Sequence, residues 1–330
     1  MKAIICTKFG PPEVLQLIEL ENPTPNDDEV LIRNYGTSIN TVDIVARSGK
    51  APSVIFWGAR QLTGFFLRLS LGGLKKPKQK IPGGGFAGEI VSVGKDVLDW
   101  KSGDRVYGYH KGACSEYMTV PENLLSKIPA NLNFQEASAI PGGFSPAILA
   151  LRDLVQIQKG DKVLIIGASG GIGTFGVQIA KIYGAEVTGV CGSGNGELVR
   201  EIGADYVIDY TKEDYSKNDN SYDFIFDAVA ASTLSKCRNI LKDEGVYISN
   251  NPVNSPKTIF HLMTNFSRKK KIKTGMADES AKNLNSLYEW IESGKLKPVI
   301  DKVYPLSQTA EAQRHYETGH SKGRVVISID

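Results

Sequence analysis

The feature that most constrains this chain is a glycine-rich turn that follows a short β-branched run. The run, residues 163–166, leads into residues 167–173 (GASGGIG), and residues 174–181 then have the pattern of a helix that Gly184 ends. A strand, a glycine turn and a helix N-terminus together form an anion site, because a pyrophosphate can approach the bare backbone and the first helical N–H groups point at it.

The motif alone has two interpretations. Gly170 and Gly173 match the last two glycines of G-x-G-x-x-G, but Ala168 replaces the first, and a tight strand-to-helix connection that binds nothing would look similar. The context favours a ligand site, because a second β-branched strand at 186–191 follows the helix at the spacing of a βαβ unit. We therefore predict dinucleotide binding.

Composition and charge exclude several classes of protein. The 330 residues suggest about two domains, and 41% hydrophobic with 23% charged residues is ordinary for a globular protein. The net charge of +3 gives no support for a nucleic-acid partner. The cysteines are far apart and form no CxxC pair, which indicates free thiols in a reducing compartment; they are Cys6, Cys114, Cys191 and Cys237.

Targeting and membrane signals are weak. Residues 1–20 have no apolar core followed by a small-residue cleavage site, so a cytoplasmic location is expected. The apolar window 54–74 contains Arg60, Arg68 and several glycines, which makes it a poor membrane span. A membrane contact through residues 55–80 is the less favoured alternative to a solvated loop.

The first part of the chain, to about residue 125, is predicted to be β-rich. Short strands are expected at 30–35, 86–94 and 114–120, and 103–108 should turn into a further strand. Many short strands separated by glycine and proline are typical of a compact barrel-like domain.

The sequence pattern changes after residue 127. Helices are expected at 134–139 and 147–155, and after them strands and helices alternate. Six strands with interleaved helices predict a doubly wound parallel sheet; they are expected at 163–167, 186–191, 206–209, 224–227, 245–249 and about 271–274. A helix at about 278–292 and strand patterns at 297–306 and 323–329 follow. The predicted domains are 1–126 with 276–330, and 127–275.

Several motifs spread over nearly the whole chain resemble one superfamily: 38–43 (SINTVD), 87–90 (AGEI), 103–106 (GDRV), 115–117 (SEY), 168–173 (ASGGIG), 203–210 (GADYVIDY) and 297–300 (KPVI). The chain resembles the medium-chain dehydrogenase/reductases, and among them the zinc-free quinone oxidoreductases of the zeta-crystallin-like branch. The resemblance implies an α/β protein with a GroES-like β-rich catalytic domain and a Rossmann-type doubly wound domain. It also implies an oligomer, usually a dimer or a tetramer, and a homodimer is expected here.

No metal site is expected. Zinc-dependent members use a cysteine and a Gly-His-Glu histidine, but here Asn40 lies near the cysteine position and residues 83–85 (GGG) occupy the Gly-His-Glu region. Without a Lewis acid, oxidation of a simple alcohol fits poorly. Hydride transfer to a quinone or an α,β-unsaturated carbonyl fits better, because such acceptors need alignment and a donor for the developing oxyanion.

Asn40 is the candidate catalytic residue, because its amide can donate to the acceptor carbonyl and the family places an asparagine of this motif at the active site. The alternative is that Asn40 caps the helix that begins near Thr41. Asp43 is expected to brace local structure. Tyr107 and Tyr109 are weak candidates for a proton donor, and water could supply the proton instead.

The cofactor is expected to be NADP(H). After the second strand, residues 191–195 (CGSGN) contain no carboxylate that would repel a 2′-phosphate, and Ser193, Asn195 and Tyr210 can donate to it. Because these donors are neutral, we expect a modest preference for NADPH over NADH. The other residues assigned to the cofactor site are Ser169, Gly170, Gly171, Ile172, Gly173, Ala228, Val229 and Asn250.

Three positions depart from the family pattern: Gly85 replaces an acidic residue, Pro146 a threonine, and Gly194 a cation. They motivate a second hypothesis, a catalytically weak NADPH-binding protein that acts as a sensor. Within enzymes, a zinc-free alcohol dehydrogenase or an enoyl reductase is the alternative. The pocket loops expected to select the substrate are 50–80 and 250–270.

Overall fold

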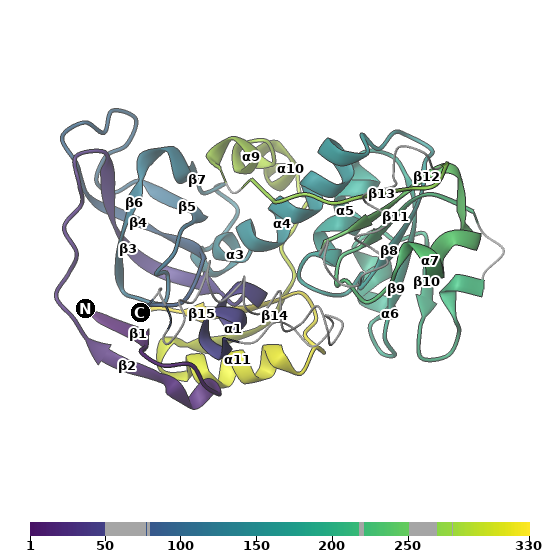
Figure 1. The fold of residues 1–330 in the computed structure, drawn as a ribbon. Coiled ribbons are helices and arrows are strands. Elements are labelled where there is room, and N and C mark those ends of the chain that lie inside the picture. The colour runs from purple at the N-terminus through teal and green to yellow at the C-terminus, as the bar shows by residue number, and fades with distance from the viewer. Residues whose placement is uncertain (50–76, 78–79, 218–220, 251–268, 279) are drawn as a thin grey trace. The chain divides into compact units, whose positions relative to one another are not determined.

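The computed structural model describes residues 1–49, 77, 80–217, 221–250, 269–278 and 280–330 (Figure 1). The described residues form two compact units. The first contains the residues up to Gly142 and those from 280 to Asp330, and the second contains the residues from Gly143 to Asp278. The expected pocket loops and the stretch 55–80 lie largely outside the described residues.

The first unit is built on two sheets. A two-stranded antiparallel sheet pairs β1 with β2, and a seven-stranded sheet has the order β14-β15-β3-β4-β5-β7 with β6 also paired to β3. The strands are β1 Lys2–Cys6, β2 Leu15–Glu19, β3 Glu29–Ser38, β4 Gly85–Val93, β5 Arg105–Tyr109, β6 Tyr117–Pro121, β7 Leu125–Lys127, β14 Ile300–Pro305 and β15 Arg324–Ser328. The segment after residue 280 thus completes the sheet begun by the N-terminal segment, as predicted.

The long central strand β3 carries the first unit's core. Val30 and Ile32 alternate with more exposed neighbours and pack with Phe86, Ile90 and Val106, which are all fully buried. Alternation with period two is what a sheet with one buried face requires. The helices of this unit are α1 Thr41–Ser48, α3 Phe134–Ser138, α9 Ala281–Asn285, α10 Tyr288–Glu292 and α11 Thr309–Glu317, with 3₁₀ turns at Pro12–Val14, Glu122–Leu124 and Leu306–Gln308.

The division between the units falls at Gly142, later than the expected residue 126. Helix α3 contacts β3, β4 and β5 of the first unit. Its Phe134 stacks on Tyr35 with ring centres 4.6 Å apart, and the Arg105 guanidinium lies 4.8 Å from the Phe134 ring centre. These contacts hold residues 127–142 on the first sheet, although the sequence texture changes before them.

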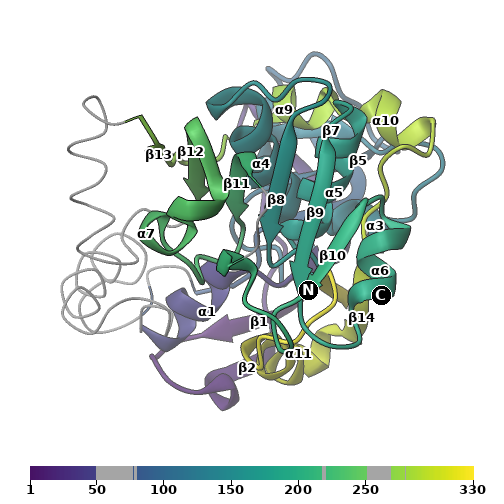
Figure 2. The ribbon, with the colours of Figure 1, turned by 90° about the vertical axis from the view of Figure 1, so that its right-hand side faces the viewer.

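The second unit contains a six-stranded parallel sheet in the order β10-β9-β8-β11-β12-β13, and Figure 2 shows these strands side by side. All six predicted strands are confirmed: β8 Lys162–Ile166, β9 Glu186–Cys191, β10 Tyr206–Asp209, β11 Tyr222–Asp227, β12 Leu241–Ser249 and β13 Lys271–Lys273. The first strand of the unit lies in the middle, so the chain winds outward in both directions. This is the strand order of a dinucleotide-binding fold.

Helices alternate with these strands. Helix α4 begins at Pro141, earlier than predicted, and a π-helix at Leu149–Leu154 follows it. Helix α5, Gly173–Ile182, contacts β8 and β9, and Gly184 follows with a φ of 80°. A left-handed glycine after the last turn is a common helix end. The remaining elements are α4 Pro141–Ile148, α6 Gly196–Glu201, α7 Leu234–Cys237 and 3₁₀ turns at Tyr215–Lys217 and Arg238–Ile240.

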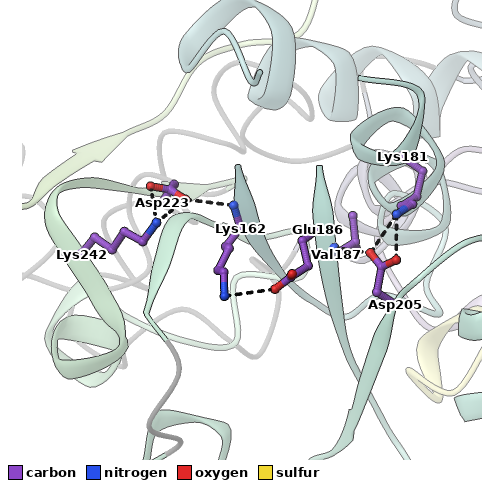
Figure 3. Close-up of polar contacts among 7 residues, drawn as sticks. All are labelled: Lys162, Lys181, Glu186, Val187, Asp205, Asp223 and Lys242. Atoms are coloured by element: carbon purple, nitrogen blue, oxygen red, sulfur yellow. Dashed lines mark hydrogen bonds and ion pairs between the residues drawn. The ribbon is translucent and has the colours of Figure 1, made fainter. Parts of the chain in front are cut away.

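The amino ends of the parallel strands are joined by ion pairs (Figure 3). Lys162 Nζ of β8 lies 3.3 Å from the Glu186 carboxylate of β9, and the Lys162 N–H donates to Asp223 at 2.9 Å. Lys242 of β12 contacts the same Asp223 carboxylate at 2.8 Å. These contacts link four neighbouring strand starts of the sheet.

A third ion pair extends this edge toward β10. The Asp205 carboxylate accepts from Lys181 Nζ at 2.8 Å and from the Val187 N–H at 2.7 Å. Helix α5, strand β9 and the entry to β10 are therefore tied together. Among the described helices, none is both long and apolar enough to cross a membrane.

Candidate active site

The glycine turn after β8 has the geometry that the sequence predicts. Gly167 has a φ of 79°, a conformation that side chains rarely adopt. A Cβ on Gly173 would lie 2.0 Å from the Gly167 carbonyl oxygen, so helix α5 can pack this close to the strand end only with glycine there. The turn therefore delivers the N-terminus of α5 to the carboxyl edge of the sheet, where it can bind an anion.

The replacement of the first motif glycine by Ala168 does not disturb this turn. Gly167, one residue earlier, takes the positive φ, and the N–H groups of Gly167 and Ala168 both donate to the Val190 carbonyl of β9 at 3.0 and 2.9 Å. At Gly170 the nearest atom to an added Cβ is the Gly167 oxygen at 3.4 Å. Gly170 is thus not required by packing.

The predicted residues after β11 and β12 lie beside this turn. An added Cβ on Gly167 would meet the Val229 side chain at 2.6 Å. The Ala228 N–H donates to the last residue of β8 at 3.1 Å, and the Asn250 amide contacts the Ala228 carbonyl at 3.5 Å. The carboxyl ends of β8, β11 and β12 therefore bring these residues to one edge, where ligands of parallel sheets bind.

A cavity of about 340 Å³ opens at the carboxyl ends of β9 and β10. It lies where the second strand of a dinucleotide fold meets the adenosine ribose. Its lining contains two cations and two carboxylates, and the lining residues are Cys191, Gly192, Gly194, Gly196, Glu197, Arg200, Val207, Asp209 and Lys212.

Residues 191–195 contain no carboxylate, but the neighbouring strand β10 brings one to this cavity. Parallel pairing of β10 with β9 places Asp209 opposite Cys191. The Asp209 carboxylate accepts from the Thr211 and Ser193 hydroxyls, each at 2.7 Å. These two hydrogen bonds, of which the one from Thr211 has the larger effect, lower the pKa of Asp209 to about 2. A negative charge is therefore present beside the site expected for the 2′-phosphate.

The expectation that only neutral donors line the site is wrong. Arg200 of α6 and Lys212 after β10 both line the cavity. Lys212 Nζ lies 3.5 Å from Asp209, whereas Arg200 has no ion pair with any described residue. Gly194 has a φ of 81°, so the turn itself favours glycine at the position where relatives often have a cation. The positive charge comes from neighbouring elements instead.

Asn195 connects this cavity to the glycine turn, because its Nδ2 donates to Ser169 Oγ at 3.3 Å. Its Oδ1 is buried and has no hydrogen-bond partner in the described part of the chain, so it remains available to accept from a ribose hydroxyl. Tyr210 is half exposed, and its hydroxyl lies 3.2 Å from where a Cβ of Gly192 would be. Both predicted residues therefore lie near the predicted ribose.

In the first unit, Asn40 follows β3 and stands at the N-terminus of α1 with extended backbone angles. Its side chain is 6% exposed; Nδ2 donates to the Ser38 carbonyl at 2.9 Å, and Oδ1 accepts from Arg324 at 2.5 Å. The Asp43 carboxylate accepts from the N–H groups of Asn40 and Gly83, both at 2.8 Å. Asp43 thus braces local structure, as expected.

The glycines at 83–85 carry no side chain that could bind a metal, and the space beside two of them is filled. A Cβ on Gly84 would lie 2.5 Å from the Tyr109 ring, and a Cβ on Gly85 would lie 2.7 Å from the Ser138 carbonyl oxygen. Tyr109 therefore fills the space of the histidine position. The described residues contain no cluster of three or more His, Cys, Asp or Glu side chains that could hold a metal ion.

The two tyrosines differ in their suitability as proton donors. Tyr107 is fully buried, its hydroxyl donates to the Leu284 carbonyl at 3.3 Å, and burial raises its pKa. It is a core residue. Tyr109 is partly exposed and lies over Gly84. Gly84 precedes Gly85, which pairs with Ser38 near the end of β3; Tyr109 is therefore the nearer of the two tyrosines to the Asn40 end of the sheet.

Comparisons with known proteins agree with both units. Residues 26–130 match the alcohol dehydrogenase GroES-like domain, and residues 202–327 match the zinc-binding dehydrogenase family. The chain is 32% identical to 2-methylene-furan-3-one reductase of Solanum lycopersicum over 99% of this chain and 79% of that protein. It is 30% identical to the chloroplastic NADPH-dependent alkenal/one oxidoreductase of Arabidopsis thaliana over 99% of this chain and 79% of that protein.

Among solved structures, the quinone oxidoreductase from Coxiella burnetii is similar, with a TM-score of 0.84 and 25% identity over 100% of this chain and 99% of that chain. Fold, motifs and full-length similarity therefore give one conclusion. The chain belongs to the medium-chain dehydrogenase/reductase superfamily, in its quinone oxidoreductase branch.

Proposed function

We propose that this protein is an NADPH-dependent reductase that transfers hydride to a quinone or an α,β-unsaturated carbonyl without zinc. The observation that carries the proposal is the end of β3. There the chain offers the Asn40 amide, while Tyr109 occupies the space beside Gly84 where a metal ligand would stand. An amide donor suits an acceptor whose carbonyl is already polarised.

The second unit supplies the cofactor site. The glycine turn and the N-terminus of α5 would hold the pyrophosphate, and Asn195 Oδ1 would accept from the ribose. Arg200 and Lys212 would contact the 2′-phosphate, opposed by the charge of Asp209. The loss of a cation at Gly194 would therefore be compensated.

The first unit supplies the acceptor site. NADPH, when bound, supplies a hydride. A side-chain amide N–H of Asn40 would donate to the acceptor oxygen as negative charge develops there. Tyr107 is committed to the Leu284 carbonyl, so water or Tyr109 would return the proton. The departure at Gly85 has a steric cause, since the Ser138 carbonyl leaves no room for an acidic side chain.

Two observations support zinc independence, although relatives of the matched family are described as zinc-binding. The four cysteines are free and buried. The sequence between residues 50 and 80 contains no Cys, His, Asp or Glu, so it adds no ligand of these types. A homodimer and a cytoplasmic location remain predictions from the sequence.

The test uses purified protein with a panel of quinones, alkenals, enones and enoyl thioesters, with NADPH and NADH. Turnover of quinones or enones is expected, with activity unchanged after chelator treatment. Asn40→Ala should lower kcat by about 10²-fold or more, the typical cost of one oxyanion donor. Loss of activity on zinc removal, or no turnover above background with any acceptor, would contradict the proposal.

A further inference from the structure

We infer that Arg324, on β15, is a positioning residue that sets and polarises the Asn40 carboxamide. The inference deepens the proposed function and rests on it. Arg324 lies 284 residues beyond Asn40 in the sequence, and β15 pairs with β3 so that the two side chains meet. No motif of the sequence connects them.

The Arg324 contact fixes which way the amide points. Arg324 Nη2 donates to Asn40 Oδ1 at 2.5 Å and to Ser38 Oγ at 3.0 Å. A guanidinium has donors only, so the group that faces it must be the amide oxygen. The amide nitrogen then points the other way, where the Ser38 carbonyl takes one N–H at 2.9 Å. The Asn40 side chain also acts on the nearby Asp43 carboxylate and opposes the rise of its pKa; we assign the second N–H of Nδ2 to the substrate.

The cation also changes the strength of that donor. A hydrogen bond from a charged donor to the amide oxygen withdraws electron density, and bonds in such a chain strengthen one another at low dielectric. Arg324 is 3% exposed and Asn40 is 6% exposed, so the dielectric around the pair is low. The remaining Asn40 N–H should therefore stabilise an oxyanion better than an amide alone would.

The surrounding atoms pack closely around the pair. A Cβ on Gly142 would lie 2.2 Å from Asn40 Oδ1 and 3.1 Å from Arg324 Nη2. Asp43 balances the buried cation; burial raises the pKa of its carboxyl, and the Gly83 and Asn40 N–H bonds and the Arg324 charge oppose that rise. Gly142, Asp43 and Arg324 thus enclose one orientation of the amide.

The first experiment compares two buried arginines of the same unit. Arg47 is 2% exposed and donates to Gln313 and to the Gly10 carbonyl but not to Asn40, so Arg47→Gln is the matched control for the cost of a buried arginine. Both R47Q and R324Q should lower the melting temperature. R324Q alone should lower kcat about 10²-fold, the scale of a misplaced catalytic group, with the KM for NADPH unchanged. Equal kcat values in the two variants would overturn the inference.

A double-mutant cycle separates positioning from an independent effect. In an Asn40→Ala background, R324Q should cost nothing further in kcat, because the group it positions is gone. Additive losses would overturn the inference. If R324Q fails to fold, Gly142→Ala is used in its place. The added Cβ on residue 142 should displace the Asn40 amide oxygen while Arg324 is retained. A Gly142→Ala protein with the kcat of the wild type would also contradict the inference.

A readout without turnover distinguishes this inference from the proposed function. Selective ¹⁵N-asparagine labelling, with Asn40→Ala to assign the signal, follows the side-chain NH₂ protons of Asn40. R324Q should shift them upfield and R47Q should not. If the shift is found but no acceptor is reduced, the proposed function fails and the positioning stands. If acceptors are reduced but R324Q shifts nothing, the positioning fails and the function stands.

Discussion

The carboxyl and amino ends of the six-stranded sheet are made by the same strands and have opposite character. At the amino end, Asp223 bonds Lys242 and the Lys162 N–H, and Asp205 bonds Lys181 (Figure 3). At the carboxyl end, the chain turns at Gly167 with a positive φ, and Asn195 Oδ1 has no partner among the described residues. Charged groups are paired at the amino end, whereas we assign the carboxyl end to a ligand.

This difference shows where the second unit holds stability and where it holds function. Asn195 Oδ1 is buried without a described partner, which costs free energy until a ligand donates to it. Arg200 likewise forms no ion pair with any described carboxylate. At the amino end the Asp223 and Asp205 carboxylates have partners, although the buried Tyr222 hydroxyl has none among the described residues, so the ion pairs there should matter for stability. Changes at the two ends should therefore separate binding from folding, and four predictions test this, the largest effect first.

The glycine turn should show the largest effect. Gly173→Ala places a Cβ 2.0 Å from the Gly167 oxygen, so it should destabilise the protein by about 1–3 kcal/mol and abolish measurable NADPH binding. Gly170→Ala meets only an ordinary contact at 3.4 Å and should weaken NADPH binding with stability retained. Fluorescence titration with NADPH and urea denaturation measure both; a G170A protein with wild-type affinity would remove Gly170 from the pyrophosphate site.

Arg200 should have the next largest effect. Arg200→Ala removes the cation that no described carboxylate pairs, so NADPH binding should weaken about tenfold to a hundredfold while NADH binding stays the same. The ratio of kcat/KM for the two cofactors, at one acceptor concentration, gives the result. An equal loss for both cofactors would place the 2′-phosphate away from Arg200.

Asp209 should act in the opposite direction and more weakly. Its pKa of about 2 keeps the carboxylate charged at neutral pH. Asp209→Asn removes that charge from the pocket, and the preference for NADPH should rise about two- to fivefold, the range of solvent-exposed charge pairs. The same kcat/KM ratio reports it, and a fall in the ratio would mean that Asp209 helps to hold the cofactor.

The amino end should give the smallest effect, on stability alone. Burial raises the pKa of Asp205, but the bonds from Lys181 and the Val187 N–H outweigh it, so the net pKa is lowered. Its contribution is then present above the unfolded pKa of about 3.9 and is lost as pH falls through the folded value. Asp205→Asn should cost about 1 kcal/mol or less at pH 7, and this cost should shrink as pH falls through the folded pKa.

Urea denaturation of Asp205→Asn and the parent protein across pH measures this difference. NADPH affinity at neutral pH serves as the control and should not change, because Asp205 lies at the other end of the strands. A change in affinity equal to that of Arg200→Ala would show that the two ends are not independent.

Much of the fold could be predicted, because it depends on local pattern. The β-branched runs predicted all six parallel strands, and Gly167 to Gly173 predicted the turn. Helix boundaries were less accurate. Helix α4 starts at Pro141 because proline suits a first helical turn, and the helix expected at 278–292 is divided into α9 and α10.

The candidate site could be predicted only in part. The turn residues and the residues after β11 lie at the carboxyl edge of the sheet, because each group directly follows a predicted strand in the sequence. Arg200, Lys212 and Asp209 were missed, although two signals were present. Arg200 lies one helical turn after Gly196, and parallel pairing of 206–209 with 188–191 brings Asp209 to the cavity.

The sequence by itself determined the parallel sheet, the glycine turn and the lack of zinc ligands at 83–85, since each depends on neighbouring residues. The tertiary structure decided which charges meet. Register between strands placed Asp209 beside Cys191, and pairing of β15 with β3 brought Arg324 to Asn40. Such contacts join residues far apart in the chain, and electrostatic interactions depend on distance and burial, which a linear pattern does not contain.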